Sequence, residues 1–447
     1  GWRKRRVAVV GSGPAGLYAA WTLACNGVAV DVIERGPALR TRGRAVARFM
    51  HSRQLDPESN LLFGEGGAGT YSDGKLYTRT QHPLEAPILQ TLIDAGAEPA
   101  IAFDARAHIG TDRLHRILPR LRTRLEEMGV RFHFETRLDG FEIVGQGSSR
   151  RVRGLQTPQG EIGADAVVLA LGHSARDTLR ALARQGLGIE SKAFQIGLRI
   201  EHPQPLIDRG RFGEGADLAL LGHAYYGLTA KAAGDLHAVH SFCMCPGGQI
   251  VAAVSQPGLL CTNGMSNSRH SSPWANSGLV VSLGPREFGE GAFAGVEFQE
   301  RIESAFFEAG GGDYSVPAQR VVDFLAGRES RSLGRSSYKL GLRSVRIDEL
   351  LSSSSSSSSM TASLRAAILR FDNQIRGYAG DEGMLVGIES RSSGPLRIPR
   401  DPHSRLAVGF ENLWPVGEGA GYAGGIMSAA VDGARSAWAL LGHHESR

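Results

Sequence analysis

A strand, a glycine-rich turn and a helix at the start of the chain constrain its fold more than any other feature. Val7 to Val10 is a short apolar run, and Gly11-Ser-Gly-Pro-Ala-Gly16 follows it directly. A second β-branched stretch, Val28 to Ile33, ends at Glu34, which lies 23 residues after the first glycine. Two parallel strands joined by such a turn and a helix are typical of a nucleotide-binding α/β unit. The pattern therefore predicts a dinucleotide site.

Each residue of the turn has a physical role in such a site. Gly11 allows the tight turn, Gly13 lets a pyrophosphate approach the backbone, and Gly16 lets the helix pack on the sheet. The free N–H groups and partial positive charge at the helix N-terminus attract the phosphates. Glu34 is placed to accept hydrogen bonds from a ribose diol. The predicted cofactor contacts in this unit are Gly11, Gly13, Pro14, Ala15, Gly16, Glu34 and Arg35.

The far end of the chain decides between FAD and NAD. Trp414 to Ile426 reads as a strand end followed by glycines and an Ala-rich helix. The carboxylate of Glu418 can hold a ribitol hydroxyl, and the helix N-terminus would face the pyrimidine edge of a flavin, which is negative when reduced. A simple NAD dehydrogenase has no use for this element, so FAD is favoured. The predicted contacts here are Gly417, Glu418, Gly425 and Ile426.

A second glycine cluster runs from Gly64 to Lys75. It lacks a preceding strand and a following helix, so a loop against the FAD is expected, with Gly66, Gly67 and Lys75 as contacts; a merely structural turn is the alternative. No second strand–turn–helix unit of this kind is found. NAD(P)H remains possible as a partner, but a separate domain for it is not expected.

Composition excludes several classes of protein. The chain has 447 residues, a formal net charge of +5 and only four cysteines, so disulfide-stapled and disordered classes fit poorly. The basic residues are spread along the chain, which argues against nucleic-acid binding. A basic patch precedes the first apolar run and imitates a signal peptide, but the glycine turn breaks that run. No membrane span is expected. We expect a cytoplasmic protein; a removed targeting segment would make the plastid stroma the alternative.

Further short motifs make the chain resemble a known superfamily. It is similar to flavoproteins with two dinucleotide-binding motifs, the glutathione-reductase-like Rossmann group, and most closely to their largely uncharacterised bacterial and plastid FAD-dependent dehydrogenases. The first and last motifs are shared by many flavoproteins, and the middle ones are more specific to this branch. The matching stretches are 11–16, 63–75, 108–112, 169–177, 196–203, 242–248, 263–266, 389–393 and 417–425.

The resemblance implies a domain plan. Residues 1–192 and 365–447 would form a discontinuous Rossmann-like FAD-binding domain, and 193–364 an inserted α+β substrate or cap domain. Leu138, Ala170 and Gly172 join the predicted FAD contacts. The eight serines from Ser352 to Ser359 read as a disordered linker or as a placeholder for other sequence. Residues 131–135, 140–144 and 151–156 read as a β-meander, and 84–97, 112–129, 297–309, 361–376 and 426–441 read as helices.

The catalytic residues are less certain than the cofactor site. The candidates are Arg199, Asn263, Arg269, Glu389 and Arg391. An arginine beside a flavin can stabilise the reduced anion or bind a substrate carboxylate; ordinary ion pairs are the alternative. Cys243 and Cys245 would lie on one strand face ~6.6 Å apart, near the limit for a disulfide, which leaves a redox pair or simple packing. No metal-ligand spacing is found.

The sequence thus predicts an FAD-dependent oxidoreductase of the dehydrogenase type acting on an unknown small molecule. A flavin monooxygenase is the first alternative. The second is a non-catalytic flavoprotein subunit or assembly factor of a larger complex.

Overall fold

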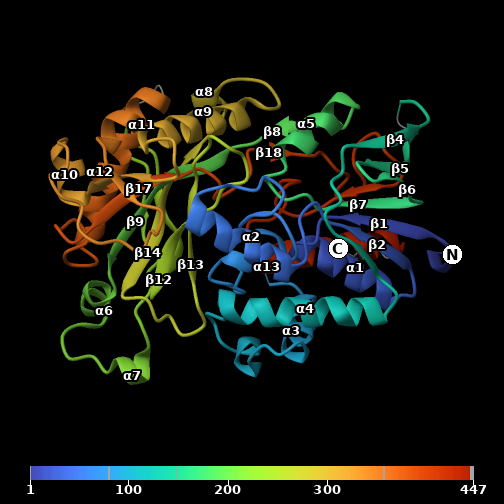
Figure 1. Cartoon of the computed structure of the whole chain (residues 1–447), viewed down its shortest axis with the longest axis horizontal. Coiled ribbons are helices and arrows are strands. Elements are labelled where there is room, and N and C mark those ends of the chain that lie inside the picture. Colours follow the sequence, from blue (N-terminus) through green and yellow to red (C-terminus); the bar gives the residue numbers. More distant parts are fainter. Residues whose placement is uncertain (1, 79–80, 148, 356–357, 443–447) are drawn as a thin grey trace.

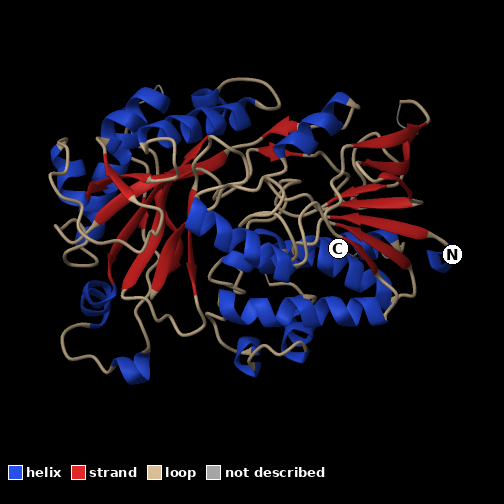
Figure 2. Ribbon diagram, viewed as in Figure 1, coloured by secondary structure: helices blue, strands red, loops and turns tan. Residues whose placement is uncertain are grey.

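The chain folds around two separate β-sheets joined by loops (Figures 1 and 2). The computed structural model describes residues 2–78, 81–147, 149–355 and 358–442. One sheet is parallel throughout and has five strands in the order β19-β7-β1-β2-β3. These are β19 (Leu413–Pro415), β7 (Ala166–Leu169), β1 (Arg6–Val10), β2 (Ala29–Ile33) and β3 (Arg131–His133).

The parallel sheet is apolar on both faces because helices and loops cover both. Val7 and Val9 pack into one hydrophobic cluster, while Ala8 and Val10 pack into another on the opposite face. This explains the continuous apolar run at the start of the sequence. The covering helices on the first face are α1 (Pro14–Cys25), α3 (Glu85–Asp94), α4 (Thr111–Glu127) and α13 (Ile426–Leu440).

The second sheet has seven strands in the order β10-β11-β14-β9-β17-β15-β16. All neighbours are antiparallel except β15 and β16. The strands are β10 (Thr229–Ala230), β11 (Val239–Cys245), β14 (Trp274–Leu283), β9 (Phe194–Pro203), β17 (Met384–Glu389), β15 (Val316–Arg320) and β16 (Leu342–Ser344). An α/β fold with a parallel Rossmann-like sheet plus a mixed-sheet domain is therefore confirmed.

Helices pack on the mixed sheet and enclose its core. Phe298, Phe306, Leu364 and Phe371 come from α9 (Ala294–Ala309) and α12 (Ser358–Asp372) and are fully buried. Strand β17 follows residue 364 and yet belongs to this sheet; the division of the chain at 192 and 364 stays a prediction. The other helices are α2 (Leu39–Ser52), α5 (Arg176–Arg184), α6 (Gln204–Phe212), α7 (Leu218–Leu221), α8 (Pro285–Phe288), α10 (Val321–Ala326) and α11 (Ile347–Ser355).

The predicted β-meander is partly wrong. Its first strand, β3, pairs in parallel with β2 and so completes the Rossmann-like sheet. The remaining two strands, β4 (Gly140–Val144) and β5 (Arg151–Thr157), form an antiparallel sheet with β6 (Gly160–Gly163). Local alternation cannot tell these cases apart, because it does not show which distant strand pairs with a segment. Two short ladders complete the fold: β8 (Glu190–Ser191) with β18 (Leu396–Arg397), and β12 (Gly248–Ala252) with β13 (Thr262–Ser266).

The serine run differs from the expected linker where it is described. Helix α11 continues to Ser355 and α12 begins at Ser358, while 356–357 lie outside the described residues. Leu351 and Met360, on either side of the run, are almost fully buried. The packing of these two side chains stabilises helix in the described part of the serine run, although a run of serines by itself favours disorder. Among the described residues, no helix is long and apolar enough to cross a membrane.

Candidate functional site

The turn after β1 has the geometry that a dinucleotide fingerprint requires. Gly11 has a φ of +109°, and a Cβ there would lie 2.2 Å from the carbonyl oxygen of Ala170. A Cβ on Gly16 would lie 1.9 Å from the carbonyl oxygen of Gly11. Gly13 differs, because its nearest neighbour on the Cβ side is Gly67 Cα at 3.9 Å. The fold itself therefore demands glycine at 11 and 16, while space remains beside Gly13.

Glu34 joins three loops at the end of β2. Its Oε2 accepts hydrogen bonds from the backbone N–H (3.0 Å) and the Oγ (2.7 Å) of Ser12. Its Oε1 accepts from the backbone N–H groups of Gly36 (2.9 Å) and Gly64 (3.1 Å). Four protein donors thus occupy the roughly four acceptor positions of the buried Glu34 carboxylate. Its binding to a ribose stays a prediction.

The glycine cluster at 64–75 packs directly against the fingerprint. Gly66 N–H donates to the carbonyl of Ser12 (3.1 Å), and a Cβ on Gly67 would lie 3.1 Å from Gly13 Cα. The buried guanidinium of Arg42 donates to the carbonyls of Asn60, Gly64 and Glu65 and so fixes this loop. Burial lowers the pKa of Arg42 to about 10. Sequence reasoning missed Arg42, since it lies in a helix that carried no recognised motif.

The C-terminal glycine element meets the fingerprint from the other side. Gly417 N–H donates to Asp432 (2.8 Å), and a Cβ on Gly433 would lie 1.9 Å from the carbonyl oxygen of Ala15. Helices α1 and α13 therefore lie in close contact. Glu418 accepts from Gly394 N–H (3.0 Å), and burial raises the pKa of Glu418 to about 7. Gly425 is the extended residue before α13, which begins at Ile426.

The helix N-termini of α1 and α13 share two features. Neither has an acidic residue in its first turn, and neither has a side chain that caps it. Uncapped N–H groups at a helix start carry a partial positive charge and lack intrahelical partners. Pro14 and Ala15 open α1 at this point. Two such ends in neighbouring helices form a surface suited to an anionic ligand.

The other predicted cofactor residues lie around the same sheet. Ala170 N–H donates to Val10 O (2.8 Å), and Gly172 has a φ of +71°. Leu138 is buried, and its carbonyl accepts from Thr178 Oγ1 (3.1 Å). Arg35 pairs with Glu58 (2.8 Å) and Asp177 (2.9 Å) and lies over the Phe63 ring. Its guanidinium is thus engaged by protein groups.

Arg199 and Glu389 form a fully buried ion pair on neighbouring strands β9 and β17. Every N–H of Arg199 has a partner: Glu389 takes two, and the others go to the Cys243 carbonyl (3.0 Å), Asn276 (2.9 Å) and Asn263 (3.1 Å). The side chains of two predicted catalytic residues, Asn263 and Glu389, therefore orient a third. Arg269 is exposed and lies outside this cluster.

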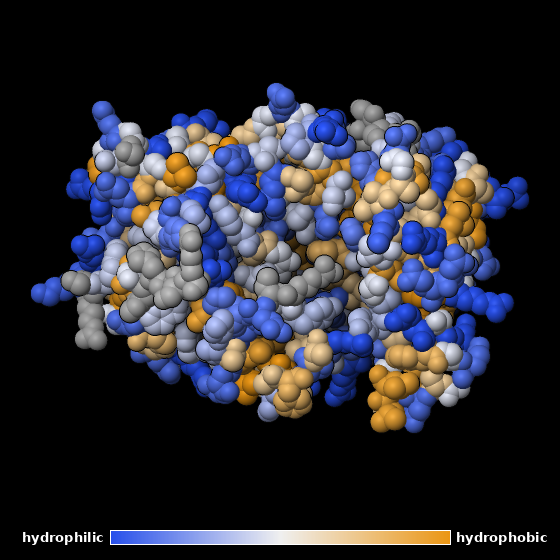
Figure 3. Space-filling view, turned by 180° about the vertical axis from the view of Figure 1, so that it is seen from behind, coloured by the Kyte–Doolittle hydropathy of each residue, from blue (hydrophilic) through white to orange (hydrophobic). Residues whose placement is uncertain are grey.

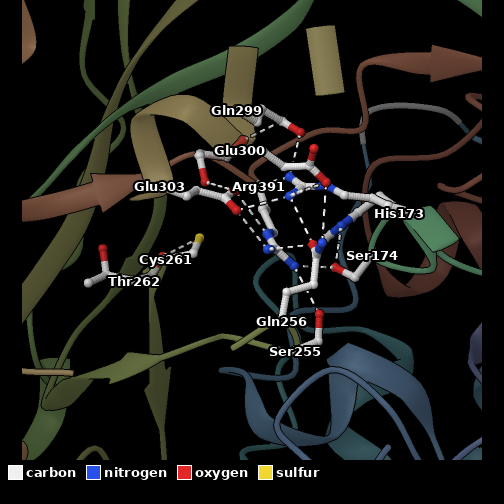
Figure 4. Close-up of polar contacts among 12 residues, drawn as sticks. His173, Ser174, Ser255, Gln256, Cys261, Thr262, Gln299, Glu300, Glu303 and Arg391 are labelled. Carbon is white, nitrogen blue, oxygen red and sulfur yellow. Dashed lines mark hydrogen bonds and ion pairs between the residues drawn. The ribbon is translucent and has the colours of Figure 1, made fainter. Parts of the chain in front are cut away.

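Arg391 belongs to a second buried cluster, shown in Figure 4. Glu303 on α9 accepts hydrogen bonds from both Arg391 and Arg176, at 2.8 to 3.0 Å. The remaining N–H groups of Arg391 reach Ser174 (3.2 Å), Ser255 (3.1 Å) and Gln256 (3.4 Å). Beside them lies His173, whose pKa is lowered to about 3 by burial and by the nearby cations. Two arginines thus share one carboxylate.

Glu303 and Arg176 were missed by sequence reasoning. Arg176 lies in the 169–177 motif, which was a usable signal, whereas Glu303 lies in an ordinary amphipathic helix.

Lys75 lies nearer the surface, with a side chain 21% exposed. Its Nζ donates to the carbonyl of Met244 and lies 3.8 Å from Asp73. Within the described residues, no group of three or more His, Cys, Asp or Glu side chains could hold a metal ion.

Comparison with known proteins now assigns the family. Residues 193–392 match the family described as FAD-dependent protein, C-terminal domain-like, and residues 9–64 match the NAD(P)-binding Rossmann-like domain. An uncharacterised protein from Clostridium beijerinckii is 41% identical over 437 residues, which make up 97% of this chain and 80% of that protein. The chain belongs to this family of FAD-dependent proteins.

Solved structures similar to this FAD-dependent protein resemble it distantly. CtdE in complex with FAD is 12% identical, with 98% of this chain and 84% of that one covered at a TM-score of 0.36. L-proline dehydrogenase from P. horikoshii is 12% identical, covers 98% and 94%, and has a TM-score of 0.37. 2-Methyl-3-hydroxypyridine-5-carboxylic acid oxygenase is 14% identical, covers 98% and 82%, and has a TM-score of 0.41.

Proposed function

We propose that this chain is an FAD-dependent oxidoreductase of the dehydrogenase type, which transfers an electron pair between a small molecule and FAD. The observation that carries the proposal is the pair of helices α1 and α13, which lie in close contact beside the glycine cluster at 64–75 and whose N-termini have no capping side chain. The pyrophosphate would lie against Gly13 and the start of α1. The start of α13 would face the flavin. Both placements use backbone N–H groups that protein side chains leave open.

The residues present fit this cofactor. The backbone of Gly13 is not crowded on its Cβ side, and Gly67 approaches it from the neighbouring loop. Bound FAD would supply the two-electron chemistry of the proposed dehydrogenase reaction. The surface of the molecule is hollowed near its middle, with apolar residues at the floor (Figure 3). Such a hollow suits a small substrate approaching a buried ring.

The buried arginines act as positioning groups in this proposal. Arg199 and Arg391 have all five N–H donors engaged by protein groups. Neither has a donor left for a substrate anion. Lys75 has three N–H donors, and the contacts described for it are with Met244 and Asp73. We therefore assign substrate or flavin contact to Lys75 and loop positioning to the two arginines.

Anaerobic spectroscopy tests the proposal. The purified chain is expected to bind FAD, identified after acid release, and to bleach when the right metabolite of a panel is added without oxygen. A chain that takes up no FAD would contradict the proposal. So would a flavin that only NAD(P)H reduces and that forms product only with oxygen, because that behaviour defines a monooxygenase. Reduction by dithionite alone, with stable co-purification of a large complex, would support the non-catalytic alternative.

A further inference from the structure

The segment between Cys243 and Cys245 departs from a regular strand. The register of β11 on β14 shifts between Phe242 and Cys245, so β11 contains a bulge at this point. Cys243 has a φ of +45°, a left-handed conformation that non-glycine residues rarely adopt. Bulges re-aim side chains and often occur at functional sites. The expected regular spacing of the two cysteines on a strand face therefore does not hold.

Two cations bind the backbone of the bulge. Arg199 donates to the carbonyl of Cys243 (3.0 Å), and Lys75 donates to the carbonyl of Met244, the residue between the two cysteines. Cys243 is half-buried, whereas Cys245 is buried and packs against Gly248 and Gly264. The pair thus consists of one partly exposed residue and one fully buried residue.

The charges around the pair favour a thiolate at Cys243. The Cys245 S–H donates to the backbone carbonyl of Cys243 (3.4 Å), so the second thiol lies beside the first residue. The nearby Cys245 thiol and the charges of Lys75 and Arg199 outweigh burial and the opposing charge of Asp73 and lower the pKa of Cys243. The pKa of Cys245 is raised by the neighbouring Cys243 and by burial. The other groups facing this region are Glu389, which pairs with Arg199, and the hydroxyl of Tyr77. A nucleophilic thiolate beside a protonated thiol is the arrangement that disulfide exchange needs.

We propose that Cys243 and Cys245 are a redox-active dithiol that reduces a small disulfide substrate. The Cys243 sulfur attacks one sulfur of the substrate, forms a mixed disulfide and releases the other half as a thiolate, which takes a proton from water. Cys245 then loses its proton and attacks Cys243, which releases the second half as a thiol. Two electrons pass from the two cysteines to the substrate, and a Cys243–Cys245 disulfide remains. This step needs no flavin, so its test is independent of the proposed function.

Alkylation of the whole wild-type chain tests the first part. The reduced protein is treated with iodoacetamide at pH 6, and labelled peptides are quantified by mass spectrometry. Cys243 is expected to react at least about tenfold faster than Cys25, because only a thiolate attacks. Cys25 is a matched internal control: it is exposed, but burial of its sulfur raises its pKa. Faster labelling of Cys25 would show that exposure alone governs reactivity and would overturn the proposal.

Oxidised glutathione, used as the disulfide probe, tests the second part. Wild type should lose two hydrogens within the peptide that holds both cysteines, and Cys245→Ser should retain a glutathione adduct on Cys243. Lys75→Met should slow the labelling of Cys243 at pH 6 by about tenfold and leave that of Cys25 unchanged, since it removes one stabilising cation. A wild-type chain that keeps both thiols in excess oxidised glutathione would overturn the proposal, whether or not the variants fold.

Discussion

The three glycines after β1 are required for two different reasons. Gly11 and Gly16 are fixed by the fold, because a Cβ at either would meet backbone atoms at 2.2 and 1.9 Å. Gly13 has an ordinary φ of −73° and no neighbour on its Cβ side closer than 3.9 Å. In the proposed function, its missing side chain serves the ligand and not the fold.

Gly13→Ala should therefore separate binding from folding. We expect the dissociation constant for FAD to rise about tenfold or more, equivalent to ~1.4 kcal/mol, because the methyl group would occupy the approach of the pyrophosphate. The stability of the flavin-free chain should change by less than ~1 kcal/mol. FAD titration and thermal unfolding measure the two effects. Gly16→Ala is the control and should lose folded protein altogether; equal FAD affinity in Gly13→Ala and wild type would contradict the assignment.

The sequence predicts some contacts of individual residues and not others. The roles of Gly11 and Gly16 could be predicted because they depend on neighbours a few residues away. Arg199 and Glu389 were predicted only as separate candidates, since 190 residues divide them. Arg199 and Glu389 form an ion pair because strands β9 and β17 pair in the sheet. A single sequence does not show which strands pair. Sequence pattern therefore marked the residues without giving their partners.

At the scale of elements, the proposed function places the flavin at the N-terminus of α13. Its first turn contains Ser428, whose Oγ donates to the carbonyl of Gly425 (3.1 Å) and accepts from Gly424 N–H (3.2 Å). The helix and its glycine start were predicted within a residue or two, because Gly-rich spacing and Ala-rich composition are local signals. Strand β3 was assigned to the wrong sheet, because its partner β2 lies about a hundred residues earlier.

Ser428→Asp should affect the helix and the flavin in opposite directions. A carboxylate in the first turn stabilises a helix by ~0.3–1 kcal/mol. The same charge would oppose the negative reduced flavin and should make its midpoint potential more negative by about 10–20 mV. Ser428→Asn is the neutral control, matched in size. Thermal unfolding and a dye-linked redox titration measure the two quantities. A potential that is the same in both variants would place the flavin away from this helix.

At the scale of the whole molecule, one buried carboxylate connects three parts of the chain. Glu303 lies on α9 beside the mixed sheet, Arg176 begins α5 beside the parallel sheet, and Arg391 follows β17. Figure 4 shows the side chains of Glu303 and Arg391 meeting from separate segments of the chain. The two-sheet architecture could be predicted from motifs and strand patterns. The cluster that joins the sheets could not, because its charged members Arg176, Glu303 and Arg391 lie at least 88 residues apart in the chain.

Glu303→Gln should weaken the contacts between these three segments and lower the free energy of unfolding. Burial alone would raise the pKa of Glu303, but the charges of Arg176 and Arg391 outweigh it and hold the pKa below the usual range. The variant would leave the buried Arg391 without its counter-charge and Arg176 with only Glu300 at 3.9 Å, so we expect a loss of about 3–5 kcal/mol in the free energy of unfolding at pH 7. Glu300→Gln is the matched control: it removes a carboxylate from the same helix, pairs mainly with the half-buried Arg180, and should cost less than ~1 kcal/mol.

The difference between wild type and Glu303→Gln should also depend on pH with a definite sign. Because the folded-state pKa lies below the ordinary value of 4.5, the unfolded chain takes up a proton first as the pH falls. The stability that Glu303 contributes is therefore complete above about pH 5.5 and is progressively lost below pH 4.5. Urea unfolding at pH 7, 5.5 and 4 should show the same gap at the two higher values and a smaller one at pH 4. A gap that stays constant to pH 4 would mean that the carboxylate does not carry the charge that joins the two sheets.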